Sequence, residues 1–233
     1  MTIYLPELQA DNIDFPSPHK ALNEPNGLLA FGGDLRPQRL LAAYHKGIFP
    51  WYSEGEPILW WSPAPRAIFN PATFSPAKSL KKFFRKSDYR ISINKATHDV
   101  IRLCAETRGI EQTWITHDMQ AAYKTLANLH RCHSVEVWQD DKLVGGLYGI
   151  QVGGIFCGES MFSLATNASK VALWHFCDHF SSHGGQLIDC QVMNDHLASL
   201  GAIELERDEF LQKLQQYQQH TLKSGCYHSQ WLN

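Results

Sequence analysis

The sequence predicts a mixed α/β fold of the α+β type, because strand-like and helix-like patterns alternate through its second half. Two alternating runs at 133–139 and 142–150 indicate a hairpin, which a third strand at about 154–158 extends into a meander. A helical pattern at 167–183 follows, and it leads into an apolar strand at 186–192. The meander therefore continues into a β–α–β unit.

Further elements precede and follow this pattern. Ser75-Pro76 has the composition of a helix cap and first turn, and the helix after it places Leu80, Phe83 and Phe84 on one face. The other expected elements are a strand at 89–93, helices at 94–108 and 117–130, a short helix ended by Gly201, a strand at 202–206 and a final helix through Tyr217.

The first 65 residues form a separate pattern that is rich in proline, glycine and aromatic residues. Pro37 suits a first helical position and Gly47 suits a helix end, so a helix is expected between them. Aromatic segments at 49–52 and 58–61 follow this helix. We therefore expect a small N-terminal domain at 1–65 and a larger domain at 66–233.

The composition is that of an ordinary globular protein: 233 residues, 44% hydrophobic and 19% charged. No apolar run approaches the roughly 20 residues that span a bilayer, and no basic segment precedes an apolar one at the start. The six cysteines are scattered singly, which favours free thiols in a reducing compartment. These features predict a cytoplasmic protein with no membrane partner.

A concentrated basic stripe lies between Lys78 and Arg90, where six basic residues accompany a single acid, although the whole chain has a net charge of −2. On the predicted helix, the cations at 78, 81, 82, 85 and 86 lie opposite the apolar face. The acids that usually alternate with such cations are missing, so a polyanionic partner is favoured over a merely solvated face.

Aromatic residues gather at 49–61. Tryptophans in a small domain usually form its core, and we expect this of most members of the cluster. Trp51, beside Pro50 in a loop-like setting, is the expected exception, exposed as a platform on which a nucleobase stacks.

Polar side chains gather at the ends of apolar, strand-like runs between Gly145 and Gly201. Asp189 and Gln191 are two residues apart on one predicted strand, so their side chains should share a face. Glu159 ends another run. A carboxylate and an amide held together on a rigid strand form a candidate catalytic site, with a polar pair that anchors a loop as the alternative.

Two other patterns have the spacing of a metal site and the chain order of a catalytic triad. His175, His179 and His183 recur every four residues, but a solvated histidine-rich face is the better interpretation, and no metal is expected. A second set, Ser160, Asp189 and His196, has the chain order of an α/β-hydrolase triad. Its Gly-x-Ser-x-Gly motif has Phe162 in place of the last glycine, so a serine hydrolase is kept only as an alternative.

Seven segments, in order over nearly the whole chain, form one specific pattern. They are Gly-Gly-Asp-Leu at 32–35, Gly-Ile-Phe-Pro-Trp at 47–51, Trp-Trp-Ser-Pro-x-Pro-Arg at 60–66, Thr-Trp-Ile-Thr at 113–116, His-Ser-Val-Glu-Val-Trp at 133–138, Phe-Cys-Gly-Glu-Ser-Met-Phe at 156–162 and Leu-Ile-Asp-Cys-Gln at 187–191. Together they resemble the bacterial leucyl/phenylalanyl-tRNA–protein transferases.

The resemblance implies a small N-terminal domain and a larger domain similar to the GCN5-related acetyltransferases. It also implies transfer of leucine or phenylalanine, and less readily methionine, from tRNA to the α-amino group of proteins that start with arginine or lysine, which marks them for N-degron proteolysis. Acetyl-CoA users of that fold have a glycine-containing phosphate loop, whereas 160–168 here has no glycine. Aminoacyl-tRNA is thus the expected donor, without a metal or organic cofactor.

The resemblance assigns roles to individual residues. Trp51 and Trp114 would hold the terminal adenosine. The acceptor stem would contact Lys78, Lys81, Lys82, Arg85 and Lys86. The pocket for the transferred side chain would comprise Leu147, Phe156, Leu173, Phe176 and Ile188. Leu147 stands where the family usually has methionine, so the preference among donors is left open.

The implied mechanism starts from an ester that is already activated, so the enzyme must chiefly position the amine and stabilise the tetrahedral intermediate. Gln191 would orient the amine, and Asp189 would be its electrostatic partner or base. Glu159, with Asp189 as a second candidate, would offer negative charge to the basic N-terminal residue of the acceptor. A non-catalytic tRNA-binding module is the remaining alternative.

Overall fold

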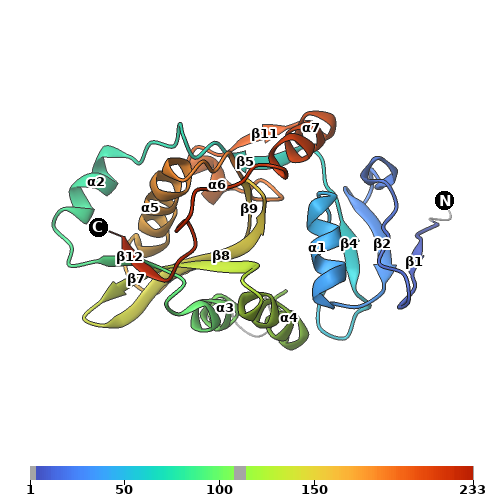
Figure 1. Ribbon diagram of the computed structural model, residues 1–233, viewed down its shortest axis with the longest axis horizontal. Helices are drawn as coiled ribbons and strands as arrows, with labels where there is room; N and C mark the ends of the chain where they lie inside the picture. Colours follow the sequence, from blue (N-terminus) through green and yellow to red (C-terminus); the bar gives the residue numbers. More distant parts are fainter. Residues whose placement is uncertain (1–3, 108–113, 233) are drawn as a thin grey trace.

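Two β-sheets organise the chain, the smaller one at the right of Figure 1. The computed structural model describes residues 4–107 and 114–232. The smaller sheet has the order β1-β2-β4-β3, and its strands are β1 (Glu7–Leu8), β2 (Leu28–Gly32), β3 (Phe49–Pro50) and β4 (Leu59–Trp61). A short 3-10 helix (Pro18–Lys20) and helix α1 (Pro37–His45) complete this part.

Local sequence explains helix α1 and the core beside it. The helix begins at Pro37, as predicted, because the fixed φ of proline suits the first helical position. Gly47 follows its end with φ +73°, a conformation that strains residues with a side chain. A Cβ there would also lie 3.0 Å from the Phe210 ring, so both the backbone and the packing favour glycine. Trp60 is fully buried, and its Nε1–H donates to the Gly32 carbonyl oxygen at 2.9 Å.

The larger sheet has the order β11-β5-β10-β9-β8-β7-β6-β12. Its strands are β5 (Arg66–Phe69), β6 (Arg90–Ile93), β7 (Cys132–Gln139), β8 (Lys142–Val152), β9 (Ile155–Ser163), β10 (Leu187–Asp189), β11 (Ile203–Leu205) and β12 (Gln230–Leu232). Strands β7, β8 and β9 form an antiparallel meander, and β10 lies parallel to β9. This arrangement confirms the predicted meander and β–α–β unit.

Helices cover both faces of the larger sheet (Figure 1). They are α2 (Lys78–Phe84), α3 (Thr97–Glu106), α4 (His117–Asn128), α5 (Ala168–Ser182), α6 (Asp195–Ser199) and α7 (Arg207–Tyr217). Helices α3 and α4 contribute to one hydrophobic core and α5 to another, because alternate residues of the meander point to opposite faces. Helix α2 packs on α5.

The first part of the chain packs directly against the second. Helix α1 contacts α4 and β8, and the hydroxyl oxygens of Tyr44 and Tyr123 lie 2.6 Å apart in a buried hydrogen bond. The chain passes from the smaller sheet to the larger one between Trp61 and Arg66. The predicted mixed α/β fold, with a smaller N-terminal and a larger C-terminal part, is confirmed.

Several local predictions were wrong. Helix α2 begins at Lys78, and Ser75 does not cap it. Strand β10 ends at Asp189, whereas β9 continues past Glu159 to Ser163. Strands β5 and β12 were not anticipated, and the predicted helix end at 108 lies outside the described residues. None of the described helices is long and apolar enough to cross a membrane.

Candidate active site

A cavity of about 340 Å³ opens where the β3 segment faces β8, β9 and β10 of the larger sheet. Its apolar wall includes all five residues predicted for the aminoacyl pocket, which come from β8, β9, α5 and β10: Leu147, Phe156, Leu173, Phe176 and Ile188. Each is at most 4% exposed. The sheet and α5 therefore bring together residues that lie up to 41 positions apart in the sequence.

Two tryptophans line the same cavity. Trp51 is 43% exposed, and its backbone carbonyl oxygen accepts a hydrogen bond of 2.6 Å from Nε1 of Trp61, whose ring lies 5.7 Å away. Trp114 is half-buried, just beyond the undescribed residues 108–113. Trp60 and Tyr52 are buried, so the expectation that Trp51 is exposed while most of the cluster is core is confirmed.

Glu159 is the only carboxylate among the described residues that line the cavity. It is 7% exposed, and Oε2 accepts a hydrogen bond of 2.8 Å from the Tyr123 hydroxyl. Its Oε1 accepts a hydrogen bond of 3.2 Å from Nε2 of Gln191. Burial raises the pKa of Glu159 to about 7, against the opposing effect of the tyrosine hydrogen bonds. Near neutral pH this carboxyl group therefore exists in both protonation states.

Asp189 lies behind the cavity wall and does not line it. Its two oxygens accept hydrogen bonds of 2.8 Å from Nε and Nη2 of Arg66, and both side chains are 1% exposed. Oδ1 also accepts the backbone N–H of Gln191 at 3.0 Å. The Arg66 guanidinium in turn donates to the Gly47 carbonyl oxygen at 3.1 Å. A bidentate ion pair thus occupies the carboxylate that was predicted to meet substrate.

The expected common face of Asp189 and Gln191 is therefore wrong. Strand alternation ends with β10 at Asp189, and Gln191 has a left-handed backbone with φ 59°. The turn directs the Gln191 amide toward Glu159 and the cavity, while the Asp189 carboxylate faces Arg66. The two residues stay linked through the backbone N–H of Gln191.

Sequence reasoning assigned no role to Arg66. Its only signal was its place at the end of the Trp-Trp-Ser-Pro-x-Pro-Arg segment. The partner Asp189 is 123 positions away, so only the pairing of β5 with β10 brings the two together.

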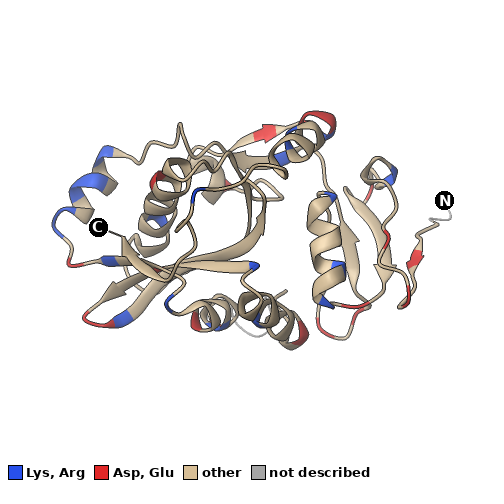
Figure 2. Cartoon of the chain, in the orientation of Figure 1, with Lys and Arg blue, Asp and Glu red and all other residues tan. Residues whose placement is uncertain are grey.

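Helix α2 carries the predicted basic surface (Figure 2). Four of the cations are exposed and one is partly buried, and none of the five has an ion-pair partner within 4–107 and 114–232: Lys78, Lys81, Lys82, Arg85 and Lys86. The opposite face of α2 packs on α5, where the ring centroids of Phe84 and Trp174 lie 5.5 Å apart. Helix α5 thus lies between the basic surface and the cavity, which it lines with Leu173 and Phe176.

The two alternative patterns also find their places. Ser160 and His196 line the cavity, but a serine-hydrolase triad needs Asp189 to hold a histidine, and Arg66 occupies that carboxylate. The predicted solvated histidine face is wrong. His175 packs on the Phe84 ring at 4.5 Å, and His179 and His183 are half-buried beside another segment of the chain.

The chain is similar to known proteins over its whole length. A family model described as leucyl/phenylalanyl-tRNA protein transferase matches residues 68–215, and a model of its N-terminal domain matches 33–64. Proteins named leucyl/phenylalanyl-tRNA–protein transferase from Vibrio atlanticus and Photobacterium profundum are each 66% identical over 100% of this chain and 98% of theirs. A solved protein of unknown function from Bacteroides thetaiotaomicron has 14% identity and a TM-score of 0.42, over 68% of this chain and 57% of that one.

Proposed function

Because the chain belongs to the leucyl/phenylalanyl-tRNA–protein transferase family, and is thus an aminoacyltransferase, we propose that it acts on proteins with N-terminal arginine or lysine. It moves leucine or phenylalanine, and less readily methionine, from tRNA to their α-amino group. The product enters N-degron proteolysis in the cytoplasm. One observation carries this proposal: a single cavity combines an apolar wall, an exposed tryptophan and one buried carboxylate.

The apolar wall receives the side chain of the transferred residue. Leu147 and Ile188 line the cavity together with Phe156 and Phe176. A methylene in such a pocket is worth about 1–3 kcal/mol, which separates large apolar side chains from small ones but does not select one exclusively. This supports the use of both leucine and phenylalanine.

The tRNA body and its terminal adenosine contact different surfaces. Trp51 and Trp114 both line the cavity, and stacking of the terminal adenosine on such rings is worth about 1–3 kcal/mol. The unpaired cations of α2 contact phosphates of the acceptor stem, and these contacts give affinity without sequence choice. Since α2 packs on α5, and α5 lines the cavity, the two surfaces are held in fixed relation.

Glu159 receives the positive end of the acceptor. Among the residues that the structure describes, it is the only carboxylate in the cavity wall, and the nearby Asp189 lies behind that wall in an ion pair with Arg66. A buried carboxylate that gains a cationic partner forms a strong charge-assisted hydrogen bond, which explains a demand for arginine or lysine.

The reaction needs no strong base. An α-amino group has a pKa of about 7.7–8.0, so roughly a third of it is already uncharged at pH 7.5. The ester is activated as well, so no metal or organic cofactor is required. Gln191 orients the amine, and Asp189 is a positioning residue that fixes Gln191 through its backbone N–H. We propose this in place of the role of electrostatic partner or base that was predicted for Asp189.

The test is transfer from labelled phenylalanyl-tRNA and leucyl-tRNA to a peptide with N-terminal arginine. Matched peptides with N-terminal glutamate, or with an acetylated arginine, serve as controls. We expect label on the first peptide alone. If no peptide is labelled, the protein is instead a non-catalytic tRNA-binding module. Equal labelling of the glutamate peptide would contradict the role proposed for Glu159.

A further inference from the structure

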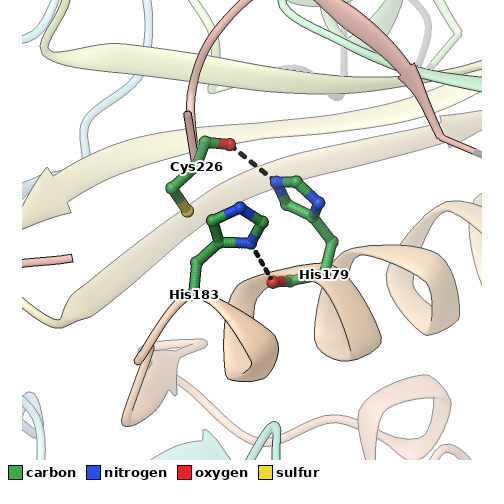
Figure 3. Close-up of side chains that lie close together, drawn as sticks. All are labelled: His179, His183 and Cys226. Carbon is green, nitrogen blue, oxygen red and sulfur yellow. Dashed lines mark hydrogen bonds between the residues drawn. The ribbon is translucent and has the colours of Figure 1, made fainter. Parts of the chain in front are cut away.

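A cluster of metal-ligating side chains lies outside the candidate active site, at the end of α5. His179 and His183 are four residues apart and therefore share one face of the helix. Cys226 reaches them from the C-terminal segment. One ligand atom from each of the three residues lies within 4.8 Å of the other two (Figure 3).

Backbone carbonyl groups orient both imidazole rings. Nδ1 of His183 lies 2.8 Å from the His179 carbonyl oxygen, so it carries the proton and leaves Nε2 as the lone-pair nitrogen. Figure 3 shows that nitrogen turned toward the other two side chains. Nε2 of His179 donates to the Cys226 carbonyl oxygen at 2.7 Å. His183, with a carbonyl on Nδ1 and a free Nε2, has the usual outer-shell arrangement of a metal-binding histidine. His179 must release its carbonyl hydrogen bond before Nε2 can bind an ion.

The surroundings suit a cation. His183 caps the C-terminal end of α5, where the helix dipole places partial negative charge. Cys226 is 3% exposed. A bound cation coordinates Cys226 as the thiolate, and the thiol proton is released to solvent.

We propose that His179, His183 and Cys226 bind a single Zn²⁺ ion. Two imidazoles and a thiolate form a borderline-soft donor set that suits zinc rather than magnesium or calcium. With Zn–N near 2.0 Å and Zn–S near 2.3 Å, tetrahedral donors lie roughly 3.3–3.6 Å apart. The ligand atoms, which lie up to 4.8 Å apart, must therefore approach one another by more than 1 Å. The proton of His179 moves from Nε2 to Nδ1, so the ring stays neutral, gives up its hydrogen bond to the Cys226 carbonyl oxygen and binds the ion through Nε2. A water molecule completes the coordination.

The ion would cross-link the C-terminal segment to the end of α5. That segment already docks on the helix end, because the backbone N–H of Lys223 donates to the His183 carbonyl oxygen at 2.9 Å. Earlier turns of α5 line the aminoacyl pocket with Leu173 and Phe176. The ion stands apart from the reacting groups, so it stabilises the fold of this end of α5 and takes no part in the transfer.

The full-length chain, stripped with a chelator and dialysed, is titrated with Zn²⁺ by calorimetry and with Co²⁺ by absorption spectroscopy. We expect one ion per chain, a thiolate-to-cobalt charge-transfer band, and a higher melting temperature with zinc. Cys226→Ser should remove the band and weaken binding by at least about 100-fold, which is the upper range for loss of an outer-shell partner alone. His183→Asn should weaken binding similarly, and it guards against misfolding of the cysteine variant.

Cys177→Ser on the same helix and His117→Gln on α4 are the matched controls, and both should bind like the unaltered chain. Binding without a thiolate band, or binding that survives both Cys226→Ser and His183→Asn, overturns the proposal. Absence of saturable one-ion binding to the unaltered chain does so as well. Transfer activity is not the readout, so the outcome is separate from that of the proposed function.

Discussion

Replacing Glu159 with glutamine should make the protein more stable at alkaline pH, although it removes the anionic group of the cavity. The cause is the pKa of the buried carboxyl group, which rises from an ordinary 4.5 to about 7 in the folded chain. Between these values the unfolded chain has released the proton and the folded chain still holds it. Rising pH therefore favours the unfolded state of the unaltered protein in this window.

The size of the effect follows from the pKa shift and the contacts. Each pKa unit corresponds to 1.36 kcal/mol, so the shift costs the unaltered chain about 3 kcal/mol above pH 7 relative to pH 4. Glutamine keeps an oxygen for the Tyr123 hydroxyl but cannot also accept from the Gln191 amide, which costs about 1 kcal/mol. The Glu159→Gln variant should thus be about 1 kcal/mol less stable near pH 4 and about 2 kcal/mol more stable at pH 8.

Urea unfolding of both proteins at half-unit steps from pH 4 to pH 8.5 measures this difference. Its sign should change inside the window, and the transfer assay should show that the variant has lost activity at every pH. Gln151→Glu, a change of the opposite sense on β8 outside the cavity lining, controls for a general effect of charge. A stability difference that is the same at pH 4 and pH 8 would falsify the buried, proton-binding state of Glu159.

Three further predictions concern the other surfaces. Asp189→Asn leaves the buried Arg66 charge uncompensated, so it should cost about 3 kcal/mol and lower Tm by roughly 6–12 °C; an inactive variant with unchanged Tm in calorimetry would instead make Asp189 catalytic. Trp51→Ala should weaken donor binding by about 1–3 kcal/mol with little loss of Tm, whereas Trp51→Phe should retain most affinity; equal binding by all three proteins contradicts a stacking role. Lys82→Ala should reduce the salt dependence of tRNA binding by about one phosphate contact in filter binding, with rates at saturating donor unchanged.

Those elements of the fold that depend on local patterns could be predicted from the sequence. The alternation in β7 and β8 and the apolar stripe of α5 specify their structure within a few residues, so the meander and the β–α–β unit were correct. The buried strand β5 has no alternating pattern because both of its faces are covered, and it was missed. The start of α2 was placed too early because Ser75 resembles a cap in sequence but lies outside the helix.

The sequence predicted which residues line the cavity better than it predicted the directions of their side chains. The five residues of the apolar wall lie on regular elements, and their positions follow from periodicity once the sheet order is known. The left-handed turn at Gln191 is rare for a residue with a side chain, and nothing in its neighbours signals it. The ion pair of Arg66 with Asp189 and the approach of Cys226 to α5 both join distant positions. Such contacts arise only from tertiary structure.

The buried guanidinium of Arg66 explains how an unreactive pair serves the reaction. It binds both oxygens of Asp189, and Asp189 accepts the backbone N–H of Gln191, the residue that we propose orients the incoming amine. On its other side it binds the Gly47 carbonyl oxygen and stacks on the Phe49 ring at 5.0 Å, just before Trp51. One cation thus links the segment before Trp51 to Gln191, the two residues for which we propose adenosine stacking and orientation of the amine. Because effective transfer depends on placing the ester and the amine within about 3–3.5 Å of each other, loss of this pair would slow the reaction even in molecules that stay folded.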